Sequence, residues 1–229
     1  MFSDNRSQTV RPAAVAGMFY PADPHDLESQ IDAFLGQAEE SGEPPKAMIV
    51  PHAGYIYSGP VAASAYAMLA TNRHSITRVV LIGPDHRVGF RGIAAPSADW
   101  FETPLGRIPV DQEAIDNLPG VERFDRAHES EHSLEVHLPF LQKSLDDFSL
   151  VPLVVGQADP ADVVAVLEAL WGGDETLIVI DAGSGIRRLG KSLIDSGSPP
   201  KEIFLYLTHA HWDHLMGFPF FTPGFIAGT

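Results

Sequence analysis

The chain of 229 residues contains no cysteine, few basic residues and no long apolar run. Without cysteine it can form neither disulfides nor thiolate metal sites, which fits the reducing cytoplasm. A net charge of −15 argues against a nucleic-acid partner, because phosphate binding needs clustered lysines and arginines. No segment approaches the ~20 apolar residues of a membrane span, and no basic start with an apolar stretch opens the chain. We therefore expect a cytoplasmic protein with no signal peptide and no membrane contact.

The charge is unevenly distributed along the chain. Residues 178–229 hold four basic and four acidic side chains, so residues 1–177 carry the whole acidic excess. The hydrophobic share of 45% is ample for a buried core, and the length suits one large domain or one domain plus a fragment. The step in charge predicts two pieces of different origin, joined near residue 177.

Short apolar runs alternate with segments of helical spacing. Strands are predicted at 48–50, 78–82, 150–155, 176–180 and 203–207, and helices at 24–35, 61–69, 132–145, 162–170 and about 185–194. Apolar strands that alternate with helices are typical of a sheet covered on both faces. The sequence thus predicts an α/β fold with a mainly parallel sheet and helices on both faces.

Two histidines follow two of these strands. His52 comes just after 48–50 and His86 just after 78–82, and glycines flank both. Open α/β sheets bind ligands in the crevice at the carboxyl ends of their parallel strands, so the two histidines could share one metal ion. The alternative is that each is a hydrogen-bonded loop residue.

Five blocks of sequence, in order and spacing, resemble the Memo family. They are RPAAVAGMFYP at 11–21, IVPHAGYIYSGPVAASAYA at 49–67, VVLIGPDHRV at 79–88, WFETPLGRIPVD at 100–111 and EHSLEVHLPF at 131–140. The resemblance covers about residues 10–177 and implies a fold like that of the extradiol ring-cleaving dioxygenases, with a site at the strand ends. It also implies that His52 and His86 match two metal-site histidines, suited to Fe or Cu, and that a radical-SAM protein is a partner.

The resemblance to this family breaks after the strand at 176–180. There the family continues into Ser-Ser-Asp followed by a histidine, with a cysteine much later. This chain has Asp181-Ala182-Gly183 instead and no cysteine. Two further groups of the family's site therefore have no counterpart, and ligand number and supporting contacts set metal affinity.

The block at 131–140 brings Glu131, His132, Glu135 and His137 together. On a helix, residues three and four apart are neighbours, so a general acid or base role is conceivable. The alternative is that these side chains bond the backbone and support the site. We favour the supporting role.

The segment THAHWDH at 208–214 places His209, His211, Asp213 and His214 directly after an apolar run. On a strand His209 and His211 point to one side, and a following turn can bring Asp213 and His214 back toward them. Neutral imidazoles and a carboxylate suit Zn or another divalent first-row metal. The alternative is a chance cluster of surface histidines.

Two stretches, IVIDAGSGIRRLG at 178–190 and IFLYLTHAHWDHLMGFPFF at 203–221, resemble the metallo-β-lactamase superfamily, and its phosphodiesterase-like hydrolases most. The resemblance implies that His209 and His211 bind one metal, and that Asp213, the candidate catalytic residue, binds a second with His214. Asp181 would steady the histidine loop, or else cap the helix near residue 185. The likeness covers about 176–229 and lacks the first strands and later ligands, so the αβ/βα segment is incomplete.

The sequence therefore predicts a Memo-like α/β domain at 1–177 followed by a partial metallo-β-lactamase-like segment at 178–229. A natural fusion, a truncation or an artefact would leave the same junction. The leading interpretation is a cytoplasmic metal-binding protein whose catalytic activity is open. One alternative is a binuclear hydrolase of a phosphodiester-type small molecule, completed by an oligomer partner or by His52 and His86. The other is a non-catalytic partner or scaffold of a radical-SAM protein.

Overall fold

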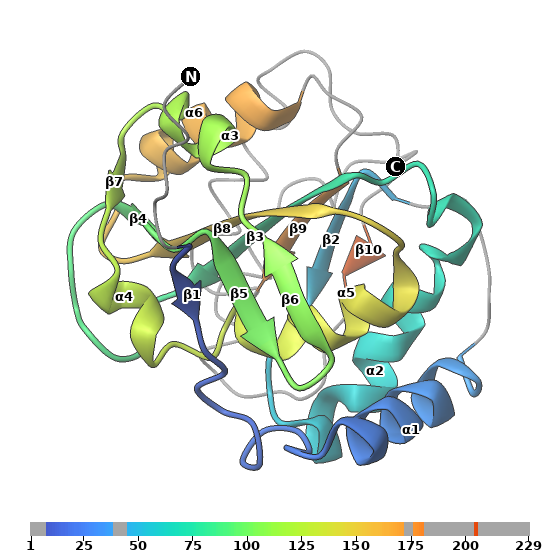
Figure 1. The fold of residues 1–229 in the computed structure, drawn as a ribbon. Helices are drawn as coiled ribbons and strands as arrows, with labels where there is room; N and C mark the ends of the chain where they lie inside the picture. The colour runs from blue at the N-terminus through green and yellow to red at the C-terminus, as the bar shows by residue number, and fades with distance from the viewer. Residues whose placement is uncertain (1–7, 39–44, 172–175, 181–203, 206–229) are drawn as a thin grey trace, which may run out of the picture.

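A seven-stranded sheet forms the centre of the molecule (Figure 1). The computed structural model describes residues 8–38, 45–171, 176–180 and 204–205. In spatial order the strands are β10 (Phe204–Leu205), β2 (Ala47–Val50), β9 (Thr176–Ile180), β3 (Arg78–Pro84), β8 (Ser149–Val155), β4 (Ile93–Ala95) and β7 (Val121–Arg123). Neighbours from β10 to β8 are parallel, and β4 is antiparallel to β8. The predicted α/β fold with a mainly parallel sheet is confirmed.

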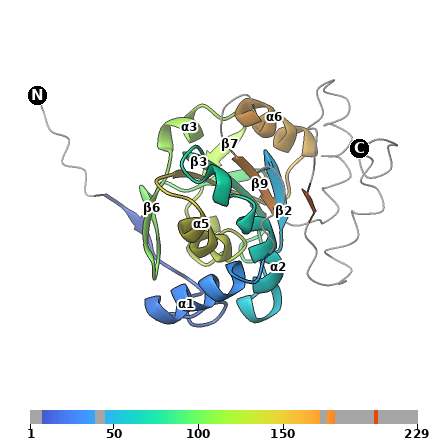
Figure 2. The same ribbon diagram turned by 90° about the vertical axis from the view of Figure 1, so that its right-hand side faces the viewer.

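Helices cover both faces of this sheet. On one side α1 (Pro24–Leu35), α2 (Tyr55–Ala67) and α5 (Leu138–Ser144) contact one another, and α6 (Pro160–Trp171) lies on the opposite side (Figures 1 and 2). Shorter helices are η1 (Ala70–Asn72), α3 (Gln112–Asp116), α4 (Arg126–Glu129) and η2 (Glu135–His137). None of the helices in the described part of the chain is long and apolar enough to cross a membrane.

A second, three-stranded sheet holds the start of the described chain. It consists of β1 (Val10–Arg11), β5 (Trp100–Thr103) and β6 (Gly106–Pro109); β5 and β6 form an antiparallel hairpin, and β1 runs parallel to β5. The sequence analysis did not predict it, because its strands are two to four residues long and carry little periodicity. This sheet fixes where the N-terminal segment meets the domain.

Helix α1 has the predicted bounds, and its local chemistry explains them. Asp23 caps the helix by accepting hydrogen bonds from the N–H groups of His25 and Asp26, and Pro24 occupies the first turn, where no donor is needed. Leu27 and Ile31, four residues apart, are fully buried against the core. A single apolar stripe was therefore enough to predict this element.

The prediction for α2 was wrong at its start. The helix begins at Tyr55 rather than at residue 61, and Pro60 lies inside it. Proline there removes one backbone donor and favours an interruption, but buried Tyr55 and Tyr66 anchor both ends of the helix. The Ser58 hydroxyl donates to Ala53 O at 2.7 Å and ties the first turn to the loop before it.

The predicted helix 132–145 was also wrong. The chain forms the short η2 and then α5, which begins only at Leu138; Pro139 lies in the first turn of α5, which is one of the two roles that the sequence allows a proline in this helix, the other being a kink. Phe140 of α5 packs between Tyr55 and Tyr66, with ring centroids 4.9 and 5.2 Å away. Glu131 and His132 precede η2 and lie outside both helices.

Candidate metal centre

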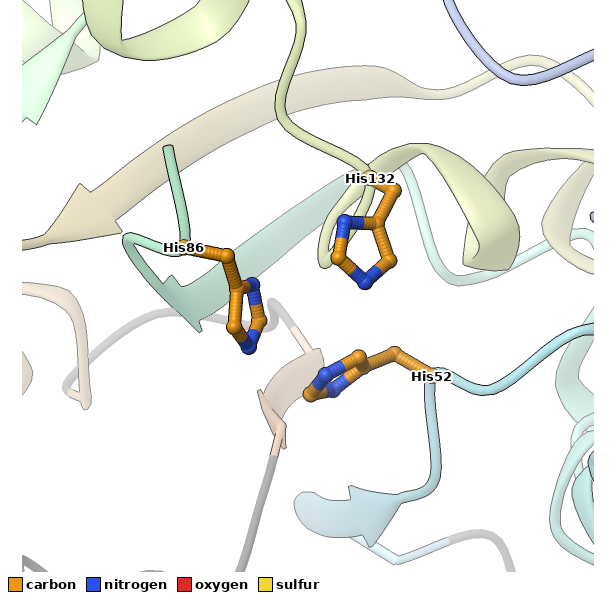
Figure 3. A group of neighbouring side chains, drawn as sticks. All are labelled: His52, His86 and His132. Atoms are coloured by element: carbon orange, nitrogen blue, oxygen red, sulfur yellow. The ribbon is translucent and has the colours of Figure 1, made fainter. Parts of the chain in front are cut away.

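Three histidines from three separate segments meet at one edge of the central sheet (Figure 3). His52 follows β2, His86 follows β3, and His132 lies in the segment between α4 and η2. Each offers a ring nitrogen, and these atoms all lie within 4.8 Å of one another. Because β2 and β3 are parallel to the same strand β9, their carboxyl ends lie on one side, and the predicted meeting of His52 and His86 follows.

The three imidazole rings also pack against one another. Their centroids lie 5.1 Å apart for His52 and His86, 5.5 Å for His52 and His132, and 4.7 Å for His86 and His132. His52 is buried, His132 is half-buried and His86 is exposed, and the Phe19 ring covers His132 with its centroid 4.6 Å away. The group is thus backed by protein and opens toward solvent on the side of His86.

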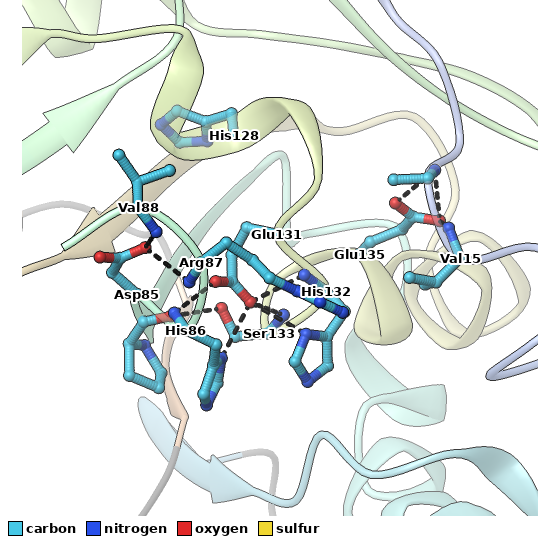
Figure 4. A network of polar contacts seen from close by, with 12 residues as sticks. Val15, Asp85, His86, Arg87, Val88, His128, Glu131, His132, Ser133 and Glu135 are labelled. Carbon is cyan, nitrogen blue, oxygen red and sulfur yellow. Dashed lines mark hydrogen bonds and ion pairs between the residues drawn. The ribbon is translucent and has the colours of Figure 1, made fainter.

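A buried carboxylate, Glu131, holds two of the three histidines (Figure 4). Its Oε1 accepts from Nδ1 of His86 at 2.9 Å and from the backbone N–H of His132 at 2.7 Å, while its Oε2 accepts from the backbone N–H of His86 at 2.7 Å. Nδ1 of His132 lies 3.1 Å from Oε1, close but poorly aligned for a hydrogen bond. Since Nδ1 of His86 donates to the carboxylate, Nε2 is the nitrogen that this ring presents to the group.

Glu131 keeps its negative charge in this environment. Burial raises the pKa of its carboxyl, but the contacts with the His132 and His86 rings and with the N–H groups of Ser133 and His86 outweigh burial and hold the pKa well below its usual range. A permanent buried anion beside three imidazoles favours a cation at their shared face. The arrangement matches the carboxylate–histidine support of known metal sites.

A close approach between β3 and the segment carrying Glu131 makes this possible. A Cβ atom on Gly83 would lie 2.8 Å from Ser133 Oγ and 2.9 Å from Leu134 Cδ2. The Ser133 hydroxyl donates to Pro84 O at 2.9 Å and joins the two segments. Glycine at the end of β3 is therefore required for Glu131 to reach His86.

A second buried carboxylate, Glu135, has different partners. Its oxygens accept from the N–H groups of Ala14 and Val15 at 2.8–3.1 Å and from the Tyr20 hydroxyl at 2.6 Å, and it pairs with the guanidinium of Arg11. Burial first, and then the charge of Glu135, raise the pKa of Tyr20 well above its usual range. Glu135 therefore fixes the N-terminal segment and does not face the histidine group.

Two further histidines are buried away from the group. Nδ1 of His137 lies 2.6 Å from the Tyr66 hydroxyl, and Nε2 of His128 donates to Ala94 O at 3.1 Å. Burial lowers the pKa of His128 to about 4 and that of His137 to about 3. Both rings are neutral at pH 7 and serve the core.

The structure brings together more of the candidate residues than the pattern alone indicated. His132, which the sequence analysis assigned to a supporting role, offers a nitrogen to the same group as His52 and His86. Glu131 contacts the group, whereas Glu135 and His137 have their partners in the N-terminal segment and in the core. Five other candidates lie outside the described residues, namely Asp181, His209, His211, Asp213 and His214.

Sequence reasoning missed the buried residue Arg11. Its Nε donates to His128 O at 2.9 Å and its Nη2 to Glu131 O at 2.7 Å, in addition to its pair with Glu135. Its position as the first residue of the quoted block RPAAVAGMFYP was the available signal. An arginine in an otherwise apolar block is worth attention, because burial of its charge requires partners.

Two family models match the chain. Residues 11–180 match the Memo-like protein family, and residues 161–229 match the metallo-beta-lactamase superfamily. The two matches overlap at 161–180, which contains α6 and β9. The overlap falls on the same strand that the sequence analysis assigned to both likenesses, while the predicted boundary at 177 stays a prediction.

Curated relatives share the first of these likenesses. A MEMO1 family protein of Thermotoga neapolitana is 40% identical over 171 residues, which cover 66% of this chain and 60% of that protein. Protein MEMO1 of Xenopus laevis is 40% identical over 161 residues, covering 66% and 53%. A MEMO1 family protein of Archaeoglobus fulgidus is 37% identical over 201 residues, covering 82% and 74%. The chain thus spans between about half and three quarters of these relatives.

Proposed function

The chain belongs to the Memo-like protein family, and from that premise we propose that it is a metal-dependent protein whose ion is held by His52, His86 and His132. The observation that carries the proposal is the convergence of three imidazole nitrogens within 4.8 Å beside a buried carboxylate. Three protein ligands with one open side are typical of reactive rather than structural metal sites.

The side chains of the chain divide the work of such a site. The three histidines would bind the ion. Glu131 orients His86 through Nδ1 and fixes the backbone of His132. The Phe19 ring shields the His132 ring from water. The exposure of His86 leaves a path for a small molecule. A bound divalent ion would supply Lewis-acid or redox chemistry at the open side.

The donor set narrows the choice of metal. Imidazole suits Zn, Cu, Fe and Ni, and binding by nitrogen donors strengthens along the first row up to Cu. Fe or Cu, as inferred from the family likeness, and Zn are all compatible with three histidines and an outer carboxylate. We expect Cu(II) to bind more tightly than Zn(II).

Metal content tests the proposal directly. The full chain and its His132→Ala, His211→Ala and double variants are expressed with Zn or Cu, separated from free metal and analysed for bound ion. We expect His132→Ala to lose about one ion per chain, and His25→Ala, an exposed histidine on α1, to lose none. If His132→Ala keeps the full metal content of the parent, the proposed site is wrong.

A second candidate function rests on the C-terminal segment. The match of residues 161–229 to the metallo-beta-lactamase superfamily, together with the motif from His209 to His214, supports a metal-dependent hydrolase with a phosphodiester-type substrate. Zn- or Mn-dependent phosphodiester hydrolysis abolished by His211→Ala would support it, and no hydrolysis with either metal would reject it. Association with a radical-SAM protein stays a prediction, testable by co-purification of the full chain with such a protein; failure to retain it would count against the prediction.

A further inference from the structure

Resting on the proposed metal site, we infer that Arg11 is a positioning residue for the histidine group. The hydrogen bonds and the ion pair of the Arg11 side chain go to the carbonyl groups of His128 and Glu131 and to the carboxylate of Glu135. Arg11 acts on the backbone of the segment that carries Glu131 and His132. Arg11 thus influences the geometry of the histidine group through the backbone that carries two of its residues.

The hydrogen bonds and the ion pair of the Arg11 side chain all fall on residues 128–135. The guanidinium donates to His128 O at 2.9 Å and to Glu131 O at 2.7 Å, and it pairs with the carboxylate of Glu135. These are the last turn of α4, the residue before His132 and the first residue of η2. One planar side chain therefore clamps both ends and the middle of the segment.

This segment needs such a clamp because it lies between helices. Residues 130–134 belong neither to α4 nor to η2. The carbonyl groups of His132 and Leu134 accept from residues 136 and 137, whereas the carbonyl of Glu131 needs a partner from outside the segment. Arg11 supplies one at Glu131, and it is itself only 6% exposed. Its position is fixed in turn by strand β1 and by the Phe101 ring, whose centroid lies 5.2 Å from the guanidinium carbon.

The clamp reaches the metal group through Glu131. The same residue whose carbonyl accepts from Arg11 turns its carboxylate to Nδ1 of His86 and to the backbone N–H of His132. A shift of the Glu131 backbone would therefore change the orientation of two of the three imidazoles together. Lysine at position 11 keeps the charge but cannot form the three-point fork of a guanidinium.

The test compares Arg11→Lys and Arg11→Gln with Arg78→Lys in the full chain carrying His211→Ala, so that the terminal motif does not contribute. Arg78 is a matched control because it is half-buried, it donates to Asp111 at 2.6 Å, and it lies at the opposite end of β3 from His86. The readouts are the Zn(II) dissociation constant by chelator competition, the visible spectrum of the Co(II)-loaded protein, and the denaturation midpoint without metal.

We expect Arg11→Lys to raise the Zn(II) dissociation constant about tenfold, the lower end of what loss of an outer partner costs, and to alter the Co(II) spectrum. Arg78→Lys should lower the denaturation midpoint without changing either metal readout. The inference is overturned if Arg11→Lys folds with the parent's affinity and spectrum, or if Arg78→Lys weakens metal binding equally. If the parent binds no metal, the proposed function fails first, and with it the premise of this inference.

Arg11→Gln guards against loss of folding as the sole explanation. It removes the cation from the buried carboxylate of Glu135, so it should destabilise the protein more than Arg11→Lys does. If metal affinity follows the denaturation midpoint across all three variants, Arg11 is merely structural. If both Arg11 variants bind Zn(II) more weakly than their denaturation midpoints alone would predict from Arg78→Lys, the positioning role holds.

Discussion

Glu131 and Glu135 lie four residues apart and are both buried, yet they organise two different regions. The region around Glu131 contains imidazoles that share an open face, and its carboxylate accepts mainly from the residues that bear them. The region around Glu135 is closed, with the charge of Arg11 and the N–H groups of Ala14 and Val15 as partners.

The difference shows what decides the role of a buried carboxylate. In the closed region the Glu135 carboxylate pairs with Arg11 and accepts from two backbone N–H groups. These contacts hold the N-terminal segment to η2. In the open region the Glu131 carboxylate is held by the His86 ring and by backbone N–H groups, an arrangement that is compatible with a cation at the shared face of the imidazoles. Stability should therefore depend on Glu135, and metal affinity on Glu131 and its histidines.

The largest expected effect is on the closed region. Glu135→Gln leaves the Arg11 guanidinium buried without its counter-charge, so the free energy of unfolding should fall by about 3–5 kcal/mol. Chemical denaturation without metal measures it. The control is Glu102→Gln, which breaks the exposed pair with Arg107 and should cost less than about 1 kcal/mol. Equal losses in the two variants would contradict the comparison.

The next effect separates two histidines of the same segment. His132→Ala removes a candidate ligand and should weaken Zn(II) binding more than the loss of an outer partner does, by about 100-fold or more. His128→Asn alters a buried ring with no place in the group, so it should lower stability and leave metal affinity unchanged. Chelator competition measures Zn(II) affinity, and denaturation measures stability, for both variants. Weaker Zn(II) binding in His128→Asn than in His132→Ala would contradict the division into two regions.

A smaller effect concerns the carboxylate of the open region. Glu131→Gln keeps the shape but loses the charge that orients His86, and Zn(II) affinity should fall about tenfold. The change should appear in the Co(II) spectrum as well, because the tautomer of His86 is no longer fixed. Unaltered affinity and spectrum would show that Glu131 serves folding alone.

The smallest effect is in the dependence of stability on pH. The pKa of His137 is lowered to about 3 by burial, so the folded state stays neutral while the unfolded chain takes up a proton below its ordinary pKa of about 6.5. The stability that neutral His137 contributes to the folded state is therefore fully present above pH 6.5, and it is lost as the pH falls toward 3. At pH 5.5 the loss is about 1 kcal/mol.

Denaturation midpoints at pH 7.5 and 5.5 measure this contribution. His137→Gln should be less stable than the parent at pH 7.5 but lose less on acidification, because the Tyr66 hydroxyl keeps a neutral partner. The exposed His25→Gln serves as the control, with the slope of the parent. A parent-like slope in His137→Gln would place the acid sensitivity elsewhere.

Sequence alone predicted that His52 and His86 would lie close together, but it did not predict that His132 lies beside them. His52 and His86 follow apolar strands, and strands that alternate with helices must be parallel, so their meeting at one edge followed from topology. His132 could not be placed in the same way. Its position depends on which donors the Glu131 carboxylate accepts, and these include the N–H groups of residues 132 and 133.

The same limit explains the errors in secondary structure. Helix α1 was predicted to the residue because its cap and its apolar stripe are local. The failed helix at 132–145 had a helical spacing as well, but tertiary contacts of Glu131, Ser133 and Glu135 redirect its first turn. Local patterns predict elements whose partners are local, and here the functional segment takes its partners from residues up to 124 positions away.

Strand β9 lies between β2 and β3, paired to both through residues 176–180. Those two strands bear His52 and His86, yet they come early in the chain and never pair with each other. During synthesis the two strands that carry these histidines are joined through β9 only after ninety further residues have emerged, since Thr176 follows His86 by ninety positions. The proposed metal site at this edge therefore forms late, together with the insertion of the strand at which the two family likenesses overlap.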